Sequence, residues 1–182
     1  KMTDGRQDST IMVAYLPQPK KDETFRQNVR FDVNGPKEYA DLIFNKIENI
    51  VSENSQYLAF ARTPGQLWEN KHRGQKSIML GIENGLALEG DIANIKHFAD
   101  RGVVYITLCH NGDNDICDSA RGNNTHNGVS EFGAKVIAEM NRLGMMVDLS
   151  HAHEKSFWDA LDISATPIVC SHSVCRALCD QP

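Results

Sequence analysis

The chain has 182 residues, 41% of them hydrophobic and 24% charged, and it carries a formal net charge of −5 at pH 7. This length suits about one folded domain with a core of its own. The acidic balance excludes a basic surface of the kind that binds nucleic acid or anionic lipid. The sequence also has no run of about 18 apolar residues that could span a membrane.

Taken in chain order, the apolar pattern predicts strands that alternate with helices. A strand at 10–16 is followed by a polar stretch and then by a helix at 37–53, where one face is marked by Tyr39, Ile43, Ile47 and Ile50. The later expected elements are a helix at 63–74, a strand at 77–83, a helix at 92–101, a strand at 103–109, a helix at 130–143, a strand at 145–149, a helix at 154–161 and a strand at 168–170.

This alternation predicts an α/β fold with a parallel sheet and right-handed crossovers. Five strands are expected. Five strands can form a doubly wound open sheet, whereas a closed (β/α)₈ barrel needs eight strands and about 250 residues. The pattern alone does not choose between these two architectures.

Four polar residues stand at the ends of these apolar strands: Glu83, His110, His151 and His172. In parallel α/β folds the carboxyl ends of the strands meet on one face, and ligands bind there. Three imidazoles and one carboxylate on such a face suit a divalent metal such as zinc. The sequence therefore predicts a metal site, and a metallohydrolase is the leading interpretation.

Other potential ligands are given structural roles. His153 lies two residues after His151 but begins a helix, so it is expected to face solvent, and His72, His97 and His126 are expected at the surface. Asp148 could steady a ligand through a hydrogen bond or serve the fold alone. The acidic loop that contains Asp113, Asn114, Asp115 and Asp118 suggests calcium, but it lacks EF-hand spacing and is expected to be solvated.

The five cysteines do not form C-x-x-C pairs, so neither a disulfide framework nor a zinc ribbon is predicted. Cys109 and Cys170 are expected inside strands as small hydrophobes, and Cys175 and Cys179, four residues apart, are expected in the core. This usage mildly favours a reducing compartment. It leaves the cytoplasm and an exported or periplasmic location both open.

Five segments resemble the membrane dipeptidase (renal dipeptidase) family of zinc peptidases. They are residues 81–85 (GIENG), 105–110 (YITLCH), 128–133 (GVSEFG), 139–151 (EMNRLGMMVDLSH) and 167–178 (PIVCSHSVCRAL). The segment at 139–151 is the most specific of them, and the similarity runs in the family's order from about residue 10 onwards.

The resemblance implies a (β/α)₈ TIM barrel of the metallo-dependent hydrolase type with a site for two zinc ions. By the same resemblance, Glu83 bridges the two ions, and His151 and His172 bind the second of them. His110 then lies beside the metals as a catalytic residue that contacts substrate. The other ligands of the first zinc are a His-x-Asp pair, which does not occur in this sequence.

The matched segments correspond to about the second to sixth barrel strands. Residues 1–182 are therefore expected to form a single incomplete barrel domain that lacks the first strand and the last strands. Such a chain has open sheet edges, which favour association. By itself it is expected to be inactive, to bind at most one zinc ion weakly and not to be a stable monomer.

For the intact protein, the resemblance implies a zinc-dependent dipeptidase that hydrolyses the peptide bond of dipeptides through a metal-bridging hydroxide and tolerates a D-residue at the C-terminal side. Another barrel amidohydrolase, such as an N-acyl-amino-acid deacylase, is the alternative enzyme. A non-catalytic binding module on the same scaffold is the alternative outside catalysis. The expected partner is a dipeptide, with no nucleic acid, and a homodimer is left open.

Overall fold

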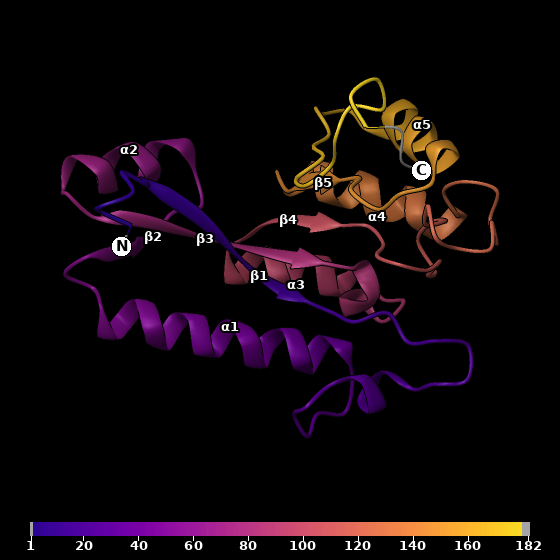
Figure 1. Cartoon of the computed structure of the whole chain (residues 1–182), viewed down its shortest axis with the longest axis horizontal. Coiled ribbons are helices and arrows are strands. Elements are labelled where there is room, and N and C mark those ends of the chain that lie inside the picture. The colour runs from indigo at the N-terminus through magenta and orange to yellow at the C-terminus, as the bar shows by residue number, and fades with distance from the viewer. Residues whose placement is uncertain (1, 180–182) are drawn as a thin grey trace.

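The computed structural model describes residues 2–179 and shows a parallel sheet with helices packed along it (Figure 1). The strands are β1 (Ser9–Tyr15), β2 (Leu58–Phe60), β3 (Lys76–Glu83), β4 (Val103–Thr107) and β5 (Met146–Asp148). The helices are α1 (Pro36–Glu53), α2 (Pro64–His72), α3 (Ala93–Arg101), α4 (Glu131–Arg142) and α5 (Glu154–Ile163), with short 3₁₀ turns η1 (Phe25–Asn28) and η2 (Gly85–Leu88).

Every pairing between these strands is parallel, as the alternation of elements predicts. Strand β1 pairs with β3 along its whole length, and β2 and β4 pair in turn with the beginning and the end of β3. Strand β5 extends the sheet beyond β4. The order β1-β3-β4-β5 does not reverse within the described strands. Strands β3, β4 and β5 are neighbours in chain order, as successive strands of a barrel wall are.

Local sequence signals explain where the helices begin and end. Pro64 occupies the first turn of α2, and the Thr63 side chain accepts a hydrogen bond from the backbone N–H of Gln66. Helix α3 ends at Gly102, whose φ of 93° is in the left-handed region that glycine adopts most easily. Among residues 2–179, no helix is both long enough and apolar enough to cross a bilayer.

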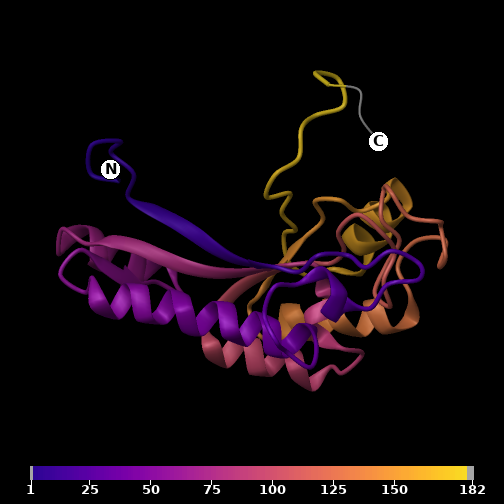
Figure 2. The same ribbon diagram turned by 60° about the horizontal axis from the view of Figure 1, so that its bottom comes forward.

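The core lies between the sheet and the helices α1, α3 and α4, which run along one side of it (Figure 2). Each helix contributes an apolar stripe, and the rings of Phe44 and Phe98 meet edge to face with centroids 6.1 Å apart. The fully buried large side chains include Phe44, Phe98, Ile78, Leu80, Ile82, Ile95, Ile106 and Ile137. Burying one such side chain stabilises the fold by about 1.5–3 kcal/mol, so this layer holds the strands in register.

The structure corrects two predictions about strands. Strand β2 was not predicted, because three residues are too few to show a period. The expected strand at 168–170 forms only a single parallel bridge, from Val169 to Asp148. Pro167 has no N–H to add to a ladder, and the N–H of Ser171 donates to the Asp148 carboxylate at 2.9 Å instead of pairing with backbone.

The predicted burial of three cysteines is wrong. Cys170, Cys175 and Cys179 are exposed, whereas Cys109 is buried as expected. After His172 the chain leaves the sheet and extends away from it (Figure 2). The segment is therefore poorly buried, and its apolar residues Val174 and Leu178 are exposed too.

Candidate metal centre

The predicted ligands come together because of the register of the sheet. One row of paired residues crosses it at the carboxyl ends of the strands, in the order Tyr15, Glu83, Thr107, Asp148 and Val169. Glu83 belongs to this row, and the three histidines each lie three residues beyond a member of it. The packed core that sets this register therefore also sets the geometry of the site.

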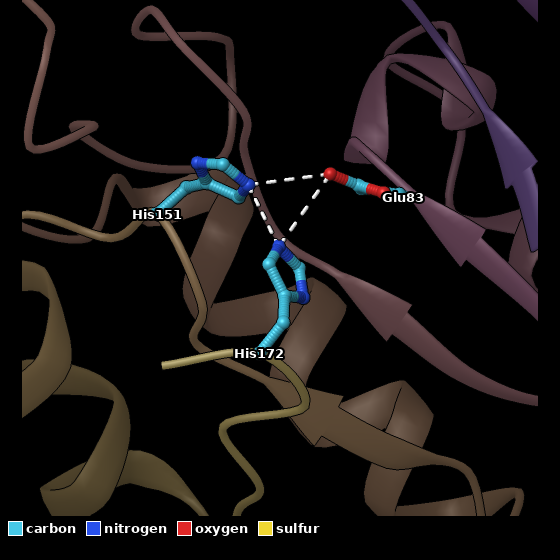
Figure 3. Close-up of side chains that lie close together, drawn as sticks. All are labelled: Glu83, His151 and His172. Carbon is cyan, nitrogen blue, oxygen red and sulfur yellow. Dashed lines mark hydrogen bonds and ion pairs between the residues drawn. The ribbon is translucent and has the colours of Figure 1, made fainter. Parts of the chain in front are cut away.

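Glu83, His151 and His172 point toward a common centre (Figure 3). Glu83 Oε1 lies 3.2 Å from His151 Nε2 and 3.6 Å from His172 Nε2. The two Nε2 atoms are 2.8 Å apart. Within residues 2–179 these three form the one group of three or more His, Cys, Asp or Glu side chains close enough to share a metal ion.

His110 lies at the edge of this group. Its Nε2 is 3.7 Å from Glu83 Oε1, and its ring contacts the His151 ring with centroids 4.5 Å apart. Burial lowers the pKa of His110, and repulsion between protonated forms of His110 and His151 lowers it further, so the neutral imidazole is favoured. Its buried Nδ1 has no hydrogen-bond partner in the described part of the chain. The single proton is therefore best placed on Nε2, which faces Glu83.

Asp148 holds the two candidate metal ligands His151 and His172 in place through neighbouring residues. This buried carboxylate accepts hydrogen bonds from the hydroxyls of Thr107 and Ser171, both at 2.6 Å, and from the N–H of Ser150 at 3.2 Å. Burial by itself would raise the pKa of Asp148, but the bonds from Ser171 and Thr107 outweigh it and the pKa is lowered. Asp148 therefore stays ionised and stabilises both the turn to His151 and the segment that carries His172.

Ser171 determines which nitrogen of His172 carries a proton. Its hydroxyl donates to Asp148, which as a carboxylate can only accept, so Ser171 Oγ accepts from His172 Nδ1–H at 2.7 Å. His172 Nε2 then keeps its lone pair and points at Glu83 and His151. Indirect orientation of this kind is typical of histidines that bind metals.

The backbone at His151 is unusual. Its φ of 70° lies in the left-handed region, which costs a non-glycine residue of order 1 kcal/mol or more. Burial lowers the pKa of His151, and the neighbouring His172 lowers it further, so the uncharged, metal-binding form is favoured. The turn thus holds the imidazole in place at a conformational cost.

The loop at 110–128, which was predicted to be solvated, is solvated only in part: Asp115 is exposed, whereas Asn114 and Asp118 are buried. Asp118 is fully buried and accepts from the N–H groups of His126 and Gly128 at 2.9 and 2.8 Å. Asn114 is also buried and donates to the Leu108 carbonyl and to Asn84. These side chains form hydrogen bonds to backbone and amide groups of the protein. This structural role explains why the loop contains so many Asp and Asn residues, without a calcium ion.

The remaining histidines lie outside the metal group, as predicted, but they are not all simply exposed. His153 caps α5, its Nδ1 accepting from the N–H of Lys155 at 3.1 Å. His97 contacts Asp41 at 2.9 Å, and His126 contacts the carbonyl of Asn114 at 2.7 Å. His72 is exposed. Sequence reasoning did not identify Asn84, Ser119, Ser171 or Arg121, since isolated polar residues carry no periodic signal.

A cavity of about 420 Å³ opens beside the histidines. It is lined by Asn111, Ser119, Ala120, Arg121, His151, His172, Ser173 and Val174. Both imidazoles and a guanidinium therefore face one space, which is of the size that small-molecule sites usually have.

The sequence matches the family model described as membrane dipeptidase (peptidase family M19) over residues 1–182. Among curated relatives it is 30% identical to dipeptidase verJ of Clonostachys rogersoniana, over all of this chain and 47% of that protein. It is 38% identical to dipeptidase 3 of Mus musculus over 57% of this chain and 22% of that protein. The chain spans less than half the length of these relatives.

Solved structures share the fold. A probable dipeptidase from Pseudomonas aeruginosa superposes with a TM-score of 0.86 at 22% identity, over 97% of this chain and 45% of that one. A metallopeptidase from Rhodobacter sphaeroides, solved with a phosphinate mimic of the dipeptide L-Ala-D-Ala, gives a TM-score of 0.81 at 19% identity, over 97% of this chain and 55% of that one.

Proposed function

Because the chain belongs to the membrane dipeptidase family of metallopeptidases, we propose that the intact protein is a zinc-dependent dipeptidase. Zinc is held by Glu83, His151 and His172, and the peptide bond of a bound dipeptide is hydrolysed in the adjoining cavity. The observation that carries the proposal is the convergence of these three side chains from three different strand ends on one centre.

The donor set and its spacing support zinc. Ligand atoms at 2.0–2.2 Å in a tetrahedral zinc site lie roughly 3.3 Å from one another. The three separations here are 2.8, 3.2 and 3.6 Å. Two imidazoles and a carboxylate form a common catalytic zinc set that leaves one position open. When bound, zinc polarises a carbonyl and lowers the pKa of water so that it attacks near neutral pH.

Glu83 is suited to hold a second ion as well. The one side-chain hydrogen bond of Glu83 within residues 2–179 uses Oε1, and Oε2 forms none. Each oxygen of a carboxylate can face a separate cation, which a single imidazole nitrogen cannot do. Glu83 would therefore be able to hold a second ion when one is bound.

The protein's own groups position the reacting atoms. His110 holds a proton on Nε2 and can donate it as a hydrogen bond to the carbonyl oxygen as negative charge develops there. Ser171 and Asp148 keep His172 Nε2 unprotonated, and Ser150 and Asp148 hold the turn that places His151. None of these residues needs to form a covalent bond with the substrate.

The first test is hydrolysis by the intact protein. We expect zinc-loaded protein to cleave L-Ala-D-Ala, the dipeptide whose mimic the Rhodobacter protein binds, and to lose this activity in chelator and regain it with zinc. N-acetyl-alanine serves as the comparison substrate. Faster release of acetate from N-acetyl-alanine would favour a deacylase, and turnover of neither compound would favour a binding module.

A second test separates His110 from the metal ligands. Replacement of His110 by alanine is expected to lower kcat by about 10²-fold, the usual cost of one lost oxyanion donor, with the zinc content unchanged. Metal analysis and steady-state kinetics measure the two effects, with the exposed His72→Ala variant as the matched control. Loss of zinc from His110→Ala would instead make His110 a ligand.

A further inference from the structure

Four Asn-Gly pairs occur in the sequence, and their surroundings in the fold differ. They are Asn34-Gly35, Asn84-Gly85, Asn111-Gly112 and Asn127-Gly128. Because glycine has no Cβ, its backbone nitrogen can approach the side chain of the preceding asparagine closely. That nitrogen can then attack the side-chain amide carbon, so an Asn-Gly pair is chemically labile unless the structure around it prevents the approach.

The pair at Asn84 is buried, and both of its reacting groups are held. Asn84 is 0% exposed, and its side-chain Nδ2 donates to the Leu16 carbonyl at 3.2 Å. The N–H of Gly85 donates to the Leu108 carbonyl, also at 3.2 Å. Neither the amide nor the attacking nitrogen is therefore free to move, and the side chain is shielded from water.

The pairs at Asn127 and Asn34 lie at the surface, but each has one reacting group engaged. The N–H of Gly128 donates to the carboxylate of the buried Asp118 at 2.8 Å. The peptide plane must turn for this nitrogen to reach the side chain, and the turn breaks a charge-assisted hydrogen bond. In the other pair, the side-chain amide and the backbone N–H of Asn34 both donate to Glu38 Oε2 at 2.8 Å. These contacts oppose the reaction at both positions.

The pair Asn111-Gly112 has none of these protections. Asn111 is exposed, and neither its side chain nor the N–H of Gly112 forms a hydrogen bond within residues 2–179. The residues on either side are anchored, because the His110 carbonyl accepts from the Ser119 hydroxyl and the Asp113 carboxylate accepts from the Ser119 N–H at 2.8 Å. The pair is therefore a short, free link between two fixed points.

From this contrast we propose that Asn111-Gly112 is a site of spontaneous deamidation in the folded protein. The backbone nitrogen of Gly112 attacks Cγ of Asn111 and loses its proton to water, so that a cyclic imide forms. The Cγ–Nδ2 bond breaks, and the departing nitrogen takes up a proton and leaves as ammonia. Water then opens the imide. Opening at Cγ gives aspartate, and opening at the main-chain carbonyl gives isoaspartate, in which the backbone runs through Cβ and Cγ.

This modification would alter the candidate metal centre, and this consequence rests on the proposed function. Asn111 lines the cavity beside the candidate ligands, so either product adds a carboxylate to the cavity wall. Isoaspartate also lengthens the main chain immediately after His110. Because His110 and Asp113 are both anchored through Ser119, the longer link has to displace one of them. We therefore expect activity to fall as isoaspartate accumulates.

Peptide mapping of the intact, zinc-loaded protein during storage in warm, mildly alkaline buffer measures conversion at all four pairs. We expect Asn111 to convert at least about 10-fold faster than Asn127, because there the hydrogen bond to a carboxylate must first be broken. Asn84 should not convert. Mass spectrometry detects the exchange of the amide nitrogen for oxygen, and enzymatic methylation detects isoaspartate. Conversion at Asn127 or Asn34 as fast as at Asn111 would overturn the proposed site.

The same measurement on the urea-unfolded protein separates the effect of the fold from that of local sequence. The four pairs should then convert at similar rates, because each has glycine after asparagine. Conversion at Asn84 and Asn127 should therefore accelerate by at least about 10-fold once their hydrogen bonds are lost, whereas Asn111 should change little. If Asn84 and Asn127 stayed equally slow in the unfolded protein, the fold would not be what protects them, and the proposed contrast would be wrong.

Gly112→Ala is the control variant. The three atoms nearest to a Cβ at Gly112 all belong to the Gln18 side chain, the closest being Cγ at 3.0 Å, and the φ of Gly112 is not positive. Alanine therefore fits after a small shift of Gln18. Its methyl group crowds the attacking nitrogen and should slow the conversion of Asn111 severalfold. An unchanged rate would contradict attack by the nitrogen of residue 112.

Activity after storage tests the consequence for His110 separately. Where dipeptides are cleaved, we expect the original protein to lose kcat in proportion to the isoaspartate at position 111 with its zinc retained, and Gly112→Ala stored beside it to keep its activity. Undiminished activity after full conversion would show that His110 is not displaced. If no dipeptide is cleaved at all, the proposed function fails, and the peptide maps still decide whether Asn111 is the site.

Discussion

Replacement of Glu83 by glutamine is expected to abolish dipeptide hydrolysis by the intact protein and to lower its zinc content, with the fold retained. Glutamine keeps the size of the side chain but removes the charge that faces three imidazoles, at 3.2 Å from His151 Nε2, 3.6 Å from His172 Nε2 and 3.7 Å from His110 Nε2. Loss of a ligand should weaken zinc binding by more than the roughly 10–100-fold typical of supporting residues.

Metal analysis, activity and circular dichroism measure these effects together. The matched control is Glu69→Gln, an exposed position in α2 at the far end of β3, which should behave like the unmodified protein. If Glu83→Gln turned over dipeptides normally with its zinc still bound, Glu83 would not be a ligand.

Replacement of Asp148 by alanine is expected to destabilise the fold by about 3 kcal/mol, because four donors, two of them on the buried residues Thr107 and Ser150, lose their acceptor at once. These donors are the N–H groups of Ser150 and Ser171 and the hydroxyls of Thr107 and Ser171. Zinc affinity should also fall, by about 10- to 100-fold, since His172 loses the Ser171 contact that orients it.

Urea unfolding of the metal-free protein measures the stability change, and the exposed Asp162→Ala in α5 serves as control, with an expected change within about 0.5 kcal/mol. Because the folded-state pKa of Asp148 lies below its ordinary value, its contribution is complete above the ordinary carboxyl pKa. That contribution is lost as the pH falls through the lowered pKa. The difference in unfolding free energy between the unmodified protein and Asp148→Ala should therefore become smaller at acid pH. A gap independent of pH would mean that packing alone makes Asp148 important.

Much of the architecture follows from local signals in the sequence. Apolar runs at β1, β3, β4 and β5 and the helical spacing between them were enough to predict a parallel α/β fold, because periodicity and capping act over a few residues. The same runs place Glu83, His110, His151 and His172 at strand ends. Parallel strands end on one face, so the sequence could also predict that these side chains would meet.

Features that depend on distant partners could not be predicted in this way. The short β2 exists because β3 offers it an edge, and the segment at 168–170 is reduced to a bridge because Asp148 captures the Ser171 N–H. Cys175 looked buried from its spacing, but its segment leaves the sheet and is exposed. In each case a contact distant in sequence, or the lack of one, decides the outcome.

The sequence by itself determined the residue types, the strand ends that carry them and the family resemblance. Only the tertiary structure decided the 2.8–3.6 Å spacing of the three candidate ligands, the Asp148–Ser171–His172 hydrogen-bond chain and the cavity that opens beside them. The physical reason is that hydrogen bonds and metal ligation depend on distances of a few tenths of an ångström. Such distances are set by the register of the sheet and the packing beneath it, which join residues up to 89 positions apart in the chain, as Glu83 and His172 are.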